Sequence, residues 1–370
     1  MTSAEKMNMV LNLEAPKKRS DIPVAPHIVT WAGTVSGLTQ AEIISDGKKW
    51  LHALDKVFQV IGKPDTSFPN YPGDAVRMMG LPVRIPGREL GENELYQFIE
   101  KPFFTDEKEY QKILKDGWSK WYMNYLMKIQ VPPKKNMVQM IMFLMKMGKN
   151  SSRVQTFLNK RGIEPHHIGG MQPIFDSLSL IRSLEEFSMD LYTNSDIIID
   201  IIRKYQLADT KSAIGRMKNA KLKRTGMFLP RSCAPFVSPA IFEEFVWPYL
   251  KPSLVELNNA GLKTVIHADA DWLPVLKYFT ELPKASLLFD FDGVTDMFKA
   301  YEIIGGWHSM GGDVPATMLA FGTPDQVSEY CERIITGLCM KGGVMLGSGC
   351  EVPMNAKVEC VKAMMDSVKQ

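Results

Sequence analysis

The sequence lacks the features that mark several broad classes of protein. No apolar run is long enough to span a bilayer, and the most apolar stretch, 137–147, carries Lys146, so we expect a buried helix there. Neither sign of charge dominates, because 44 basic residues face 41 acidic ones. We therefore expect neither a membrane nor a nucleic acid as a partner.

Cysteine is also scarce. The five cysteines, at positions 233, 331, 339, 350 and 360, are odd in number and lack the spacing of a secreted disulfide framework. The N-terminus has no continuous apolar core of the kind that a signal peptide needs. These absences predict a cytoplasmic protein in which the thiols other than Cys350 are packed in the interior.

The C-terminal half is regular, because short apolar runs alternate with helix-like segments. We expect strands in LKTVIHADAD, KASLLFDFDG, GGWHSMGGDVP and GGVMLGSGC, with a helix over Trp272–Thr280 after the first. Thr323 can cap a later helix, with Pro324 in its first turn. Sequential βα units with apolar strands predict an α/β fold, either a (β/α)8 barrel or a doubly wound sheet. The strand-to-helix turns lack a glycine-rich nucleotide-binding fingerprint, which favours the barrel.

The first hundred residues follow a different pattern, rich in loop signals such as SFPNYPGD and LPVRIPGRELG. A helix is expected near residues 40–60, but no repeating unit is visible in this region, and from about residue 106 the pattern becomes helical. We therefore divide the chain into an N-terminal elaboration, residues 1–105, and a barrel formed by residues 106–370 on which it packs.

Polar residues at the ends of the predicted strands are the candidates for a functional site. In a parallel barrel, the residues just beyond the C-terminal end of each strand converge on one mouth. The residues in these positions are His267, Asp269, Asp271, Asp290, Asp292, Asp313 and Cys350. Imidazole, carboxylate and thiol groups are ligands of zinc. Each also has a plainer interpretation: His267 can be a hydrogen-bonded structural residue, Cys350 a small buried residue, and Asp313 part of a loop or a helix cap.

Three other histidines have plainer interpretations. His166 and His167, in EPHHIGG, follow a turn, and a surface loop is favoured for them over a position lining the mouth. His308 falls inside an apolar strand and is expected to be a hydrogen-bonded core residue.

Several segments resemble a known family. GGDVPATMLAFGTPDQV and GVMLGSGCEVPMNAKVECVKAM are similar to the C-terminal half of uroporphyrinogen-decarboxylase-like proteins, and VIHADADWLPVLKYF is similar to one of their middle strands. PVRIPGRELGENELYQFIEK resembles one branch, the corrinoid-dependent methyltransferases that act on methoxylated aromatic compounds. True uroporphyrinogen decarboxylases carry an arginine-rich motif similar to M-R-Q-A-G-R, which this sequence lacks.

The resemblance implies a barrel of the uroporphyrinogen-decarboxylase type with a zinc site. Thiol-directed members bind zinc through His-x-Cys and a distant Cys, and His267 and Cys350 match the first and last of these positions. Asp269 replaces the middle Cys, which shifts the implied chemistry from activating a thiol to polarising a methyl ether. Asp290 or Asp292 is the candidate for a further ligand, and Asp269 and Asp313 are the candidate catalytic carboxylates. 

The activity implied is that of a zinc-dependent O-demethylase, also called methyltransferase I. Such an enzyme moves a methyl group from an aryl methyl ether to the Co(I) corrinoid of a separate protein. No corrinoid-binding domain is visible in this chain, so a corrinoid protein is the expected partner, and a homodimer is consistent with the superfamily. Contacts with the substrate ring are expected from Tyr96, Phe236, Trp247, Trp272 and Phe291.

Three alternatives remain open at this point. The protein can be a corrinoid methyltransferase for a thiol or another methyl donor, or a uroporphyrinogen decarboxylase. It can also be a barrel that binds a ligand without metal or catalysis.

Overall fold

A parallel sheet forms the framework of the protein, whose computed structural model describes residues 1–67, 74–78, 80, 82–167 and 169–369. Seven strands pair in the order β1-β11-β10-β9-β8-β7-β6, and all the pairs are parallel. These strands are β1 (Val24–His27), β6 (Gly170–Met171), β7 (Arg224–Phe228), β8 (Lys263–Ala268), β9 (Leu287–Phe291), β10 (Ser309–Val314) and β11 (Val344–Glu351).

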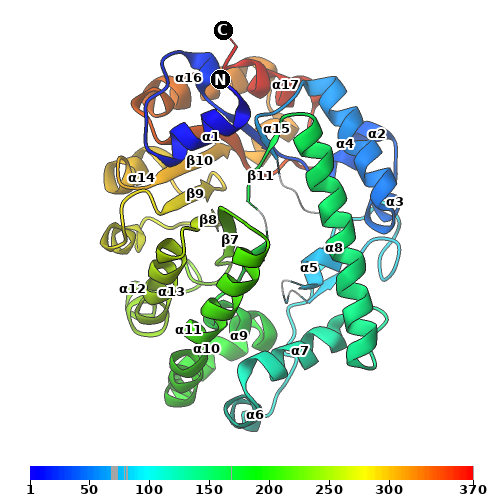
Figure 1. Ribbon diagram of the computed structural model, residues 1–370, viewed down its shortest axis with the longest axis vertical. Coiled ribbons are helices and arrows are strands. Elements are labelled where there is room, and N and C mark those ends of the chain that lie inside the picture. Colours follow the sequence, from blue (N-terminus) through cyan, green and yellow to red (C-terminus); the bar gives the residue numbers. More distant parts are fainter. Residues whose placement is uncertain (68–73, 79, 81, 168, 370) are drawn as a thin grey trace.

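Two short strands join the edges of this sheet. β2 (Thr66–Ser67) pairs in parallel with β5 (Glu164–Pro165), and the backbone N–H of Asp65 donates to the Val24 carbonyl of β1. β5 leads into β6 through residues 166–169. The strands therefore close into a (β/α)8-type barrel, which confirms the predicted fold (Figure 1).

The N-terminal segment takes part in the barrel itself. β1 pairs with β11, the last strand of the chain, with Val24 opposite Leu346, and β2 lies beside β1. The same segment contains the antiparallel pair β3 (Val83–Arg84) and β4 (Gln97–Phe98). The predicted elaboration over residues 1–105 thus supplies two strands of the ring as well as peripheral structure.

Helices surround the strands, and the long α8 stands with α5 and α7 to one side of them (Figure 1). Their bounds are α1 Ser3–Leu11, α2 Trp31–Ser36, α3 Gln40–Ser45, α4 Gly47–Ile61, α5 Asp74–Met78, α6 Lys108–Asp116, α7 Trp118–Ile129, α8 Met137–Lys160, α9 Ile174–Arg182, α10 Leu184–Thr193, α11 Ser195–Asn219, α12 Pro239–Ile241, α13 Trp247–Asn259, α14 Met297–Ile304, α15 Ala316–Phe321, α16 Pro324–Gly337 and α17 Val358–Asp366. Within the described residues, no helix is both long and apolar enough to cross a membrane.

Local signals predicted some of these helices well and others poorly. Thr323 caps α16 as predicted, and its hydroxyl accepts the Gln326 backbone N–H. The helix predicted over Trp272–Thr280 is instead a short 3₁₀ helix at Leu276–Glu281. The apolar run 137–147 does form part of a helix, α8, but the prediction that it is buried is wrong for most of it. The exposed residues of this run include Met137, Val138, Ile141, Met142 and Met145.

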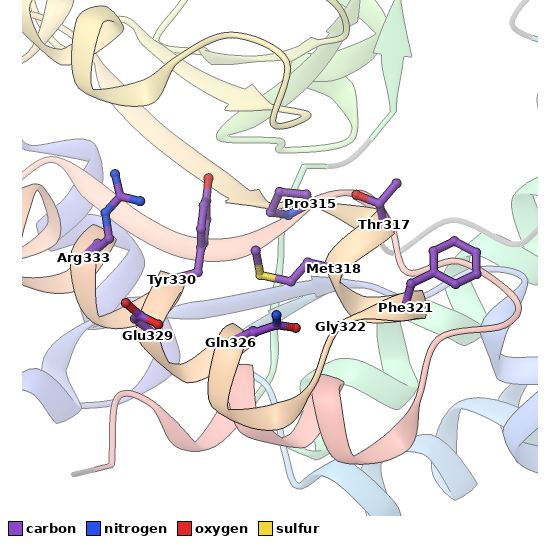
Figure 2. Close-up of a pocket in the computed structure, with 9 residues that line it drawn as sticks. All are labelled: Pro315, Thr317, Met318, Phe321, Gly322, Gln326, Glu329, Tyr330 and Arg333. Carbon is purple, nitrogen blue, oxygen red and sulfur yellow. The ribbon is translucent and has the colours of Figure 1, made fainter.

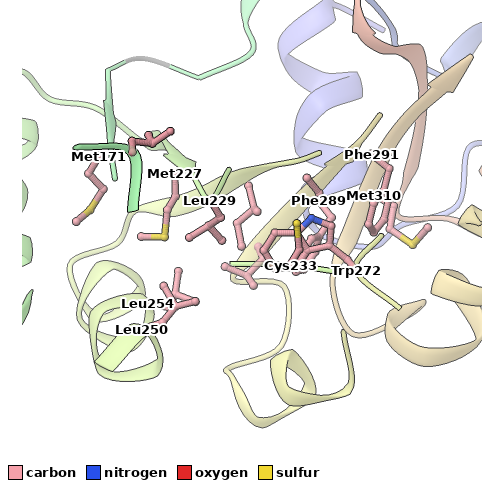
Figure 3. Close-up of a cluster of buried hydrophobic side chains, with 14 of the residues drawn as sticks. Met171, Met227, Leu229, Cys233, Leu250, Leu254, Trp272, Phe289, Phe291 and Met310 are labelled. Atoms are coloured by element: carbon pink, nitrogen blue, oxygen red, sulfur yellow. The ribbon is translucent and has the colours of Figure 1, made fainter. Parts of the chain in front are cut away.

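The strands separate two apolar regions. Strand residues that face outward from the barrel, such as Phe289 on β9, belong to the main core, which also includes helix residues such as Leu254 of α13 (Figure 3). Inside, a smaller cluster that we call the barrel floor joins inward-facing strand residues to α1. It consists of Met7, Met9, Val10, Leu11, Ala25, Val265, Leu288 and Met345. Because α1 closes this end, only the opposite end of the barrel is available for a site.

Candidate metal centre

The polar residues of the site lie inside the barrel, one layer above the barrel floor. Side chains on a strand alternate between its two faces, so a residue two positions after an inward-facing one also faces inward. His27, His267 and Asp290 each stand two positions beyond a floor residue, on β1, β8 and β9. The register sets His267 beside Asp290. The alternation and register of the strands therefore bring these side chains together.

The first group of possible ligands, which we call the open cluster, consists of His267, Asp269 and Cys350. His267 Nε2 lies 3.3 Å from Asp269 Oδ1 and 3.6 Å from Cys350 Sγ. All three residues are partly exposed, with 19% of the His267 side chain and 46% of the Asp269 side chain accessible. The open cluster thus lies at the barrel mouth, within reach of solvent.

The donors of the open cluster and their spacing fit a zinc ion. In a tetrahedral site with bonds of about 2.1 Å to nitrogen and oxygen and about 2.3 Å to sulfur, nitrogen lies about 3.4 Å from oxygen and about 3.6 Å from sulfur. The two distances from His267 Nε2 agree with these values. Three protein donors leave a fourth position for another ligand, which is the pattern of catalytic zinc sites.

Neighbouring carboxylates outweigh the effect of burial on the pKa of His267. Burial alone would lower the pKa of His267, but the carboxylates of Asp269 and Asp290 raise it well above its usual value. Burial would raise the pKa of Asp269, and His267 lowers it instead. The two residues therefore form a charged pair at neutral pH, and a metal ion that binds them must displace the proton on His267.

Asp290 lies on the opposite side of the His267 ring from the open cluster. Its Oδ2 is 3.3 Å from His267 Nδ1, so the ring donates Nδ1–H to the carboxylate and directs Nε2 toward Asp269 and Cys350. A carboxylate in this position fixes the tautomer and orientation of a metal-binding histidine. The structure thus places Asp290, a predicted ligand, behind the open cluster rather than in it.

A second group of possible ligands, which we call the closed cluster, consists of His27, His166 and Asp290. Each of these side chains is at most 1% exposed. Burial lowers the pKa of His27 to about 3, so its imidazole is neutral. Burial would raise the pKa of Asp290, but His27 and His166 hold it well below its usual range. The carboxylate is therefore charged although it is buried.

The loop that carries Asp269 is held by neighbouring side chains. Trp272 Nε1 donates to the Asp269 carbonyl oxygen at 2.8 Å. The two oxygens of Asp292 accept backbone N–H bonds from Ala270 and Val294, each at 2.8 Å. Among the described residues, Asp292 belongs to neither cluster. Both of its oxygens stabilise the loops around the mouth, and its role as a metal ligand stays a prediction.

Gly349 allows the segment before Cys350 to approach the loop after β9. A Cβ at this position would lie 2.3 Å from the Asp292 carbonyl oxygen, which is too close for any other residue. Glycine is therefore required where β11 brings Cys350 to the open cluster.

Asp313, a predicted catalytic carboxylate, is buried near the C-terminal end of β10. Burial raises the pKa of Asp313 to about 6, and its Oδ1 accepts a hydrogen bond from Tyr330 at 2.9 Å. Tyr330 lines a surface hollow of about 580 Å³ between α15 and α16 (Figure 2). The other residues around it are Pro315, Thr317, Met318, Phe321, Gly322, Gln326, Glu329 and Arg333. Asp313 thus connects to the hollow through the Tyr330 hydroxyl.

Three of the predicted substrate contacts lie in the hydrophobic core. Trp272 and Phe291 are fully buried in the cluster of Figure 3. Trp247 is buried at the start of α13, where its ring centre lies 5.1 Å from that of Phe279. These positions correct the prediction, because all three rings stabilise the core and are not presented to a ligand at the mouth.

The other two predicted substrate contacts are partly exposed. Phe236 lies on the loop after β7, with the Arg231 guanidinium 5.0 Å from its ring centre. That loop pairs with the loop after β8, where the Asp271 N–H donates to the Ala234 carbonyl. Tyr96 packs against the main core just before β4. The role of both residues in substrate binding stays a prediction.

The predictions for the histidines outside the open cluster were partly right. His308 is a buried core residue, as predicted, with Nε2 2.9 Å from the Phe279 carbonyl oxygen. His166 and His167, expected on the surface, are almost completely buried. His27 was not recognised, although it ends the apolar segment IPVAPH as His267 ends its own strand. The strand-end rule that selected His267 would have selected His27 too.

The four cysteines outside the open cluster are buried, as predicted, and all five are free thiols. Cys350 alone is partly exposed. Burial raises the pKa of Cys233, Cys331 and Cys339, which keeps these thiols protonated and unreactive. The contrast agrees with a ligand role for Cys350 alone.

Comparison with known proteins agrees with this architecture. A methyltransferase from Methanosarcina mazei has a similar fold, with a TM-score of 0.68 at 16% sequence identity, over 100% of this chain and 98% of that chain. No curated protein matches the chain. Residues 178–370, more than half of the sequence, match the family model for uroporphyrinogen decarboxylase. The chain therefore belongs to the uroporphyrinogen decarboxylase family.

Proposed function

We propose that this protein is a zinc-dependent methyltransferase that moves a methyl group from a methoxylated aromatic compound to the Co(I) corrinoid of a partner protein. The observation that carries the proposal is the open cluster, which brings one imidazole, one carboxylate and one thiol together at the mouth. The fold shared with a methyltransferase supports the type of reaction. 

The residues of the open cluster have distinct tasks in this proposal. His267 Nε2, Asp269 and Cys350 hold the zinc, and Asp290 keeps the His267 ring in the orientation for binding. When bound, zinc with a carboxylate in its ligand set supplies a harder Lewis acid than a site of several thiolates, which suits polarisation of an ether. The phenolate that leaves can then be stabilised as its charge develops.

The loops around the mouth keep these ligands in place. The Trp272 indole fixes the Asp269 carbonyl, and Asp292 fixes the backbone at Ala270 and Val294. Asp313 has a pKa of about 6, so part of its carboxyl is protonated near neutral pH. We propose that Asp313 supplies a proton to the phenolate product.

In this proposal, the methyl acceptor is the corrinoid of the partner protein, so turnover requires that partner. The decisive experiment is a panel of methyl donors assayed with and without a reduced corrinoid protein. Demethylation of methoxylated aromatics that requires the corrinoid protein is expected. Full activity without it would refute the proposal, and transfer only from thiols or methylamines would reassign the donor.

Uroporphyrinogen decarboxylation is the second candidate, and the family match favours it. The absence of an M-R-Q-A-G-R-like motif weighs against it, because the acidic side chains of uroporphyrinogen need cationic partners. This candidate predicts carbon dioxide release from uroporphyrinogen with neither metal nor corrinoid. Release of that kind, together with unchanged activity in Cys350→Ala, would establish it.

A further inference from the structure

The closed cluster lies where the strand pairing around the barrel is interrupted. His27 ends β1, on one side of the gap in the seven-stranded sheet between β1 and β6, and His166 follows β5, which lies in that gap. Among the described residues, the strands that cover this gap are β2 and β5, each of two residues. Asp290, on β9, lies among the strands on the other side of the ring. An ion held by these three residues would therefore connect the strands beside the gap to β9, within the seven-stranded sheet.

The distances in the closed cluster match those of bound metal ligands. Asp290 Oδ2 lies 3.3 Å from His27 Nε2 and 3.5 Å from His166 Nε2. Bonds of about 2.1 Å in a tetrahedral arrangement place such donors about 3.4 Å apart. One ligand atom from each of the three residues lies within 4.8 Å of the others. A single ion can therefore be reached by all three without a change of backbone.

Hydrogen bonding alone does not explain why three histidine rings surround the Asp290 carboxylate. Its Oδ2 faces three ring nitrogens, from His27, His166 and His267, all between 3.3 and 3.5 Å away. A carboxylate oxygen has two lone pairs, so it cannot accept three good hydrogen bonds. One lone pair can accept the His267 Nδ1–H, and the other can bind a cation that His27 and His166 also reach. The Asp290 Oδ1 atom is buried and accepts no hydrogen bond from the described part of the chain.

The charge balance also favours a cation. A buried carboxylate is costly unless a charge or several hydrogen bonds compensate for it. A divalent ion held between His27, His166 and Asp290 would supply that charge inside the barrel. Two imidazoles and one carboxylate are a common donor set for zinc and for iron(II), and cobalt(II) binds the same set.

We propose that His27, His166 and Asp290 bind a second divalent transition-metal ion inside the barrel, separate from the ion of the open cluster. The role of this ion is structural, because its ligands are closed to solvent and they connect β1, the β5–β6 segment and β9. Asp290 joins the two sites, since its Oδ2 also accepts the His267 Nδ1–H. The inference does not depend on methyl transfer.

Metal content tests the proposal directly. Protein is purified without chelators, equilibrated with zinc or with cobalt(II), desalted and analysed by elemental mass spectrometry. We expect two ions per chain in the wild type and one each in Cys350→Ala and His27→Gln. Cobalt(II) in the His27→Gln variant should show the thiolate-to-cobalt absorption of the open cluster, and in Cys350→Ala this band should be absent while one ion remains.

A matched control separates metal loss from general damage to the core. His308 is a buried histidine bonded to a backbone carbonyl and belongs to neither cluster, so His308→Gln should keep two ions. Cys350→Ala tests the closed cluster even if His27→Gln fails to fold. A Cys350→Ala protein that holds no ion, and whose melting temperature is unchanged by added zinc, would overturn the proposal. The methyl-donor assay is read separately, so the two proposals can fail independently.

Discussion

The open and closed clusters contain similar groups in opposite surroundings. Each contains histidine and aspartate, and Asp290 of the closed cluster lies beside His267 of the open cluster inside the barrel. The open cluster is partly exposed and includes a thiol, whereas the closed cluster is almost inaccessible and contains only nitrogen and oxygen donors. Access to solvent therefore decides what each ligand set can do. The exposed set can meet a substrate, and the buried set can only stabilise the ring.

Asp290→Asn should have the largest effect, because this carboxylate serves both clusters. Removing its charge takes a ligand from the closed cluster and the orienting acceptor from His267. We expect metal content to fall at both sites and the free energy of unfolding to drop by about 3 kcal/mol or more. Urea unfolding and elemental analysis of the same samples measure both effects. Loss at one site only would show that the clusters are not joined by Asp290.

Cys350→Ala should separate the clusters. We expect methyl transfer to fall at least about 100-fold, since a zinc ligand is lost, while the free energy of unfolding changes by less than about 1 kcal/mol at this partly exposed position. Steady-state rates with the corrinoid partner and denaturant unfolding provide the two readings. Cys360→Ala is the control, because Cys360 lies on α17 outside both clusters and should retain activity. A Cys350→Ala enzyme with wild-type turnover would remove the open cluster from the reaction.

Asp313→Asn tests the effect of burial on a carboxylate that lacks the imidazoles of Asp290. The pKa of Asp313 is raised from 3.8 to about 6 in the folded protein, so the folded state binds its proton more tightly than the unfolded state. The stability that this proton confers is complete below pH 3.8 and is lost as the pH rises through 6. Relative to Asp313→Asn, the wild type should therefore lose up to roughly 3 kcal/mol over this range. Unfolding curves at pH 4 and pH 7 measure the difference, and parallel curves would contradict it.

Trp272→Phe should have the smallest effect, confined to the open cluster. The variant keeps an aromatic ring in the core but loses the hydrogen bond from Nε1 to the Asp269 carbonyl. One such bond contributes about 1 kcal/mol, so zinc affinity at the open cluster should fall several-fold, with the closed-cluster ion unchanged. Competition with a chromophoric chelator gives both affinities. Equal weakening of the two sites would mean that the substitution disturbs the core as a whole.

The C-terminal half was predictable because its signals are local. The strands around His267 and Asp290 are continuous apolar runs, and the cap at Thr323 is a short-range pattern. The outward orientation of Phe291 was also predictable, because side chains alternate along a strand and the preceding residue, Asp290, faces inward. Applying that rule would have excluded Phe291 from the mouth.

The closed cluster could not be predicted from local signals in the same way. His166 follows a strand of only two residues, which is too short to produce a periodic pattern. The proximity of His27 to Asp290 depends on the order of strands around the ring. The burial of α8 was misjudged for a related reason, since the spacing of its methionines shows a helix but not which face has a partner.

The pairing of β1 with β11 has a consequence for how the protein assembles. The strand at residues 24–27 must wait for the strand at 344–351, so more than three hundred residues leave the ribosome before the ring can close. Contacts between such distant segments form late and slow folding. His27 therefore takes its place beside Asp290 only after residue 351 has been made. Assembly of the closed cluster should therefore coincide with the pairing of β1 and β11, late in the maturation of the barrel.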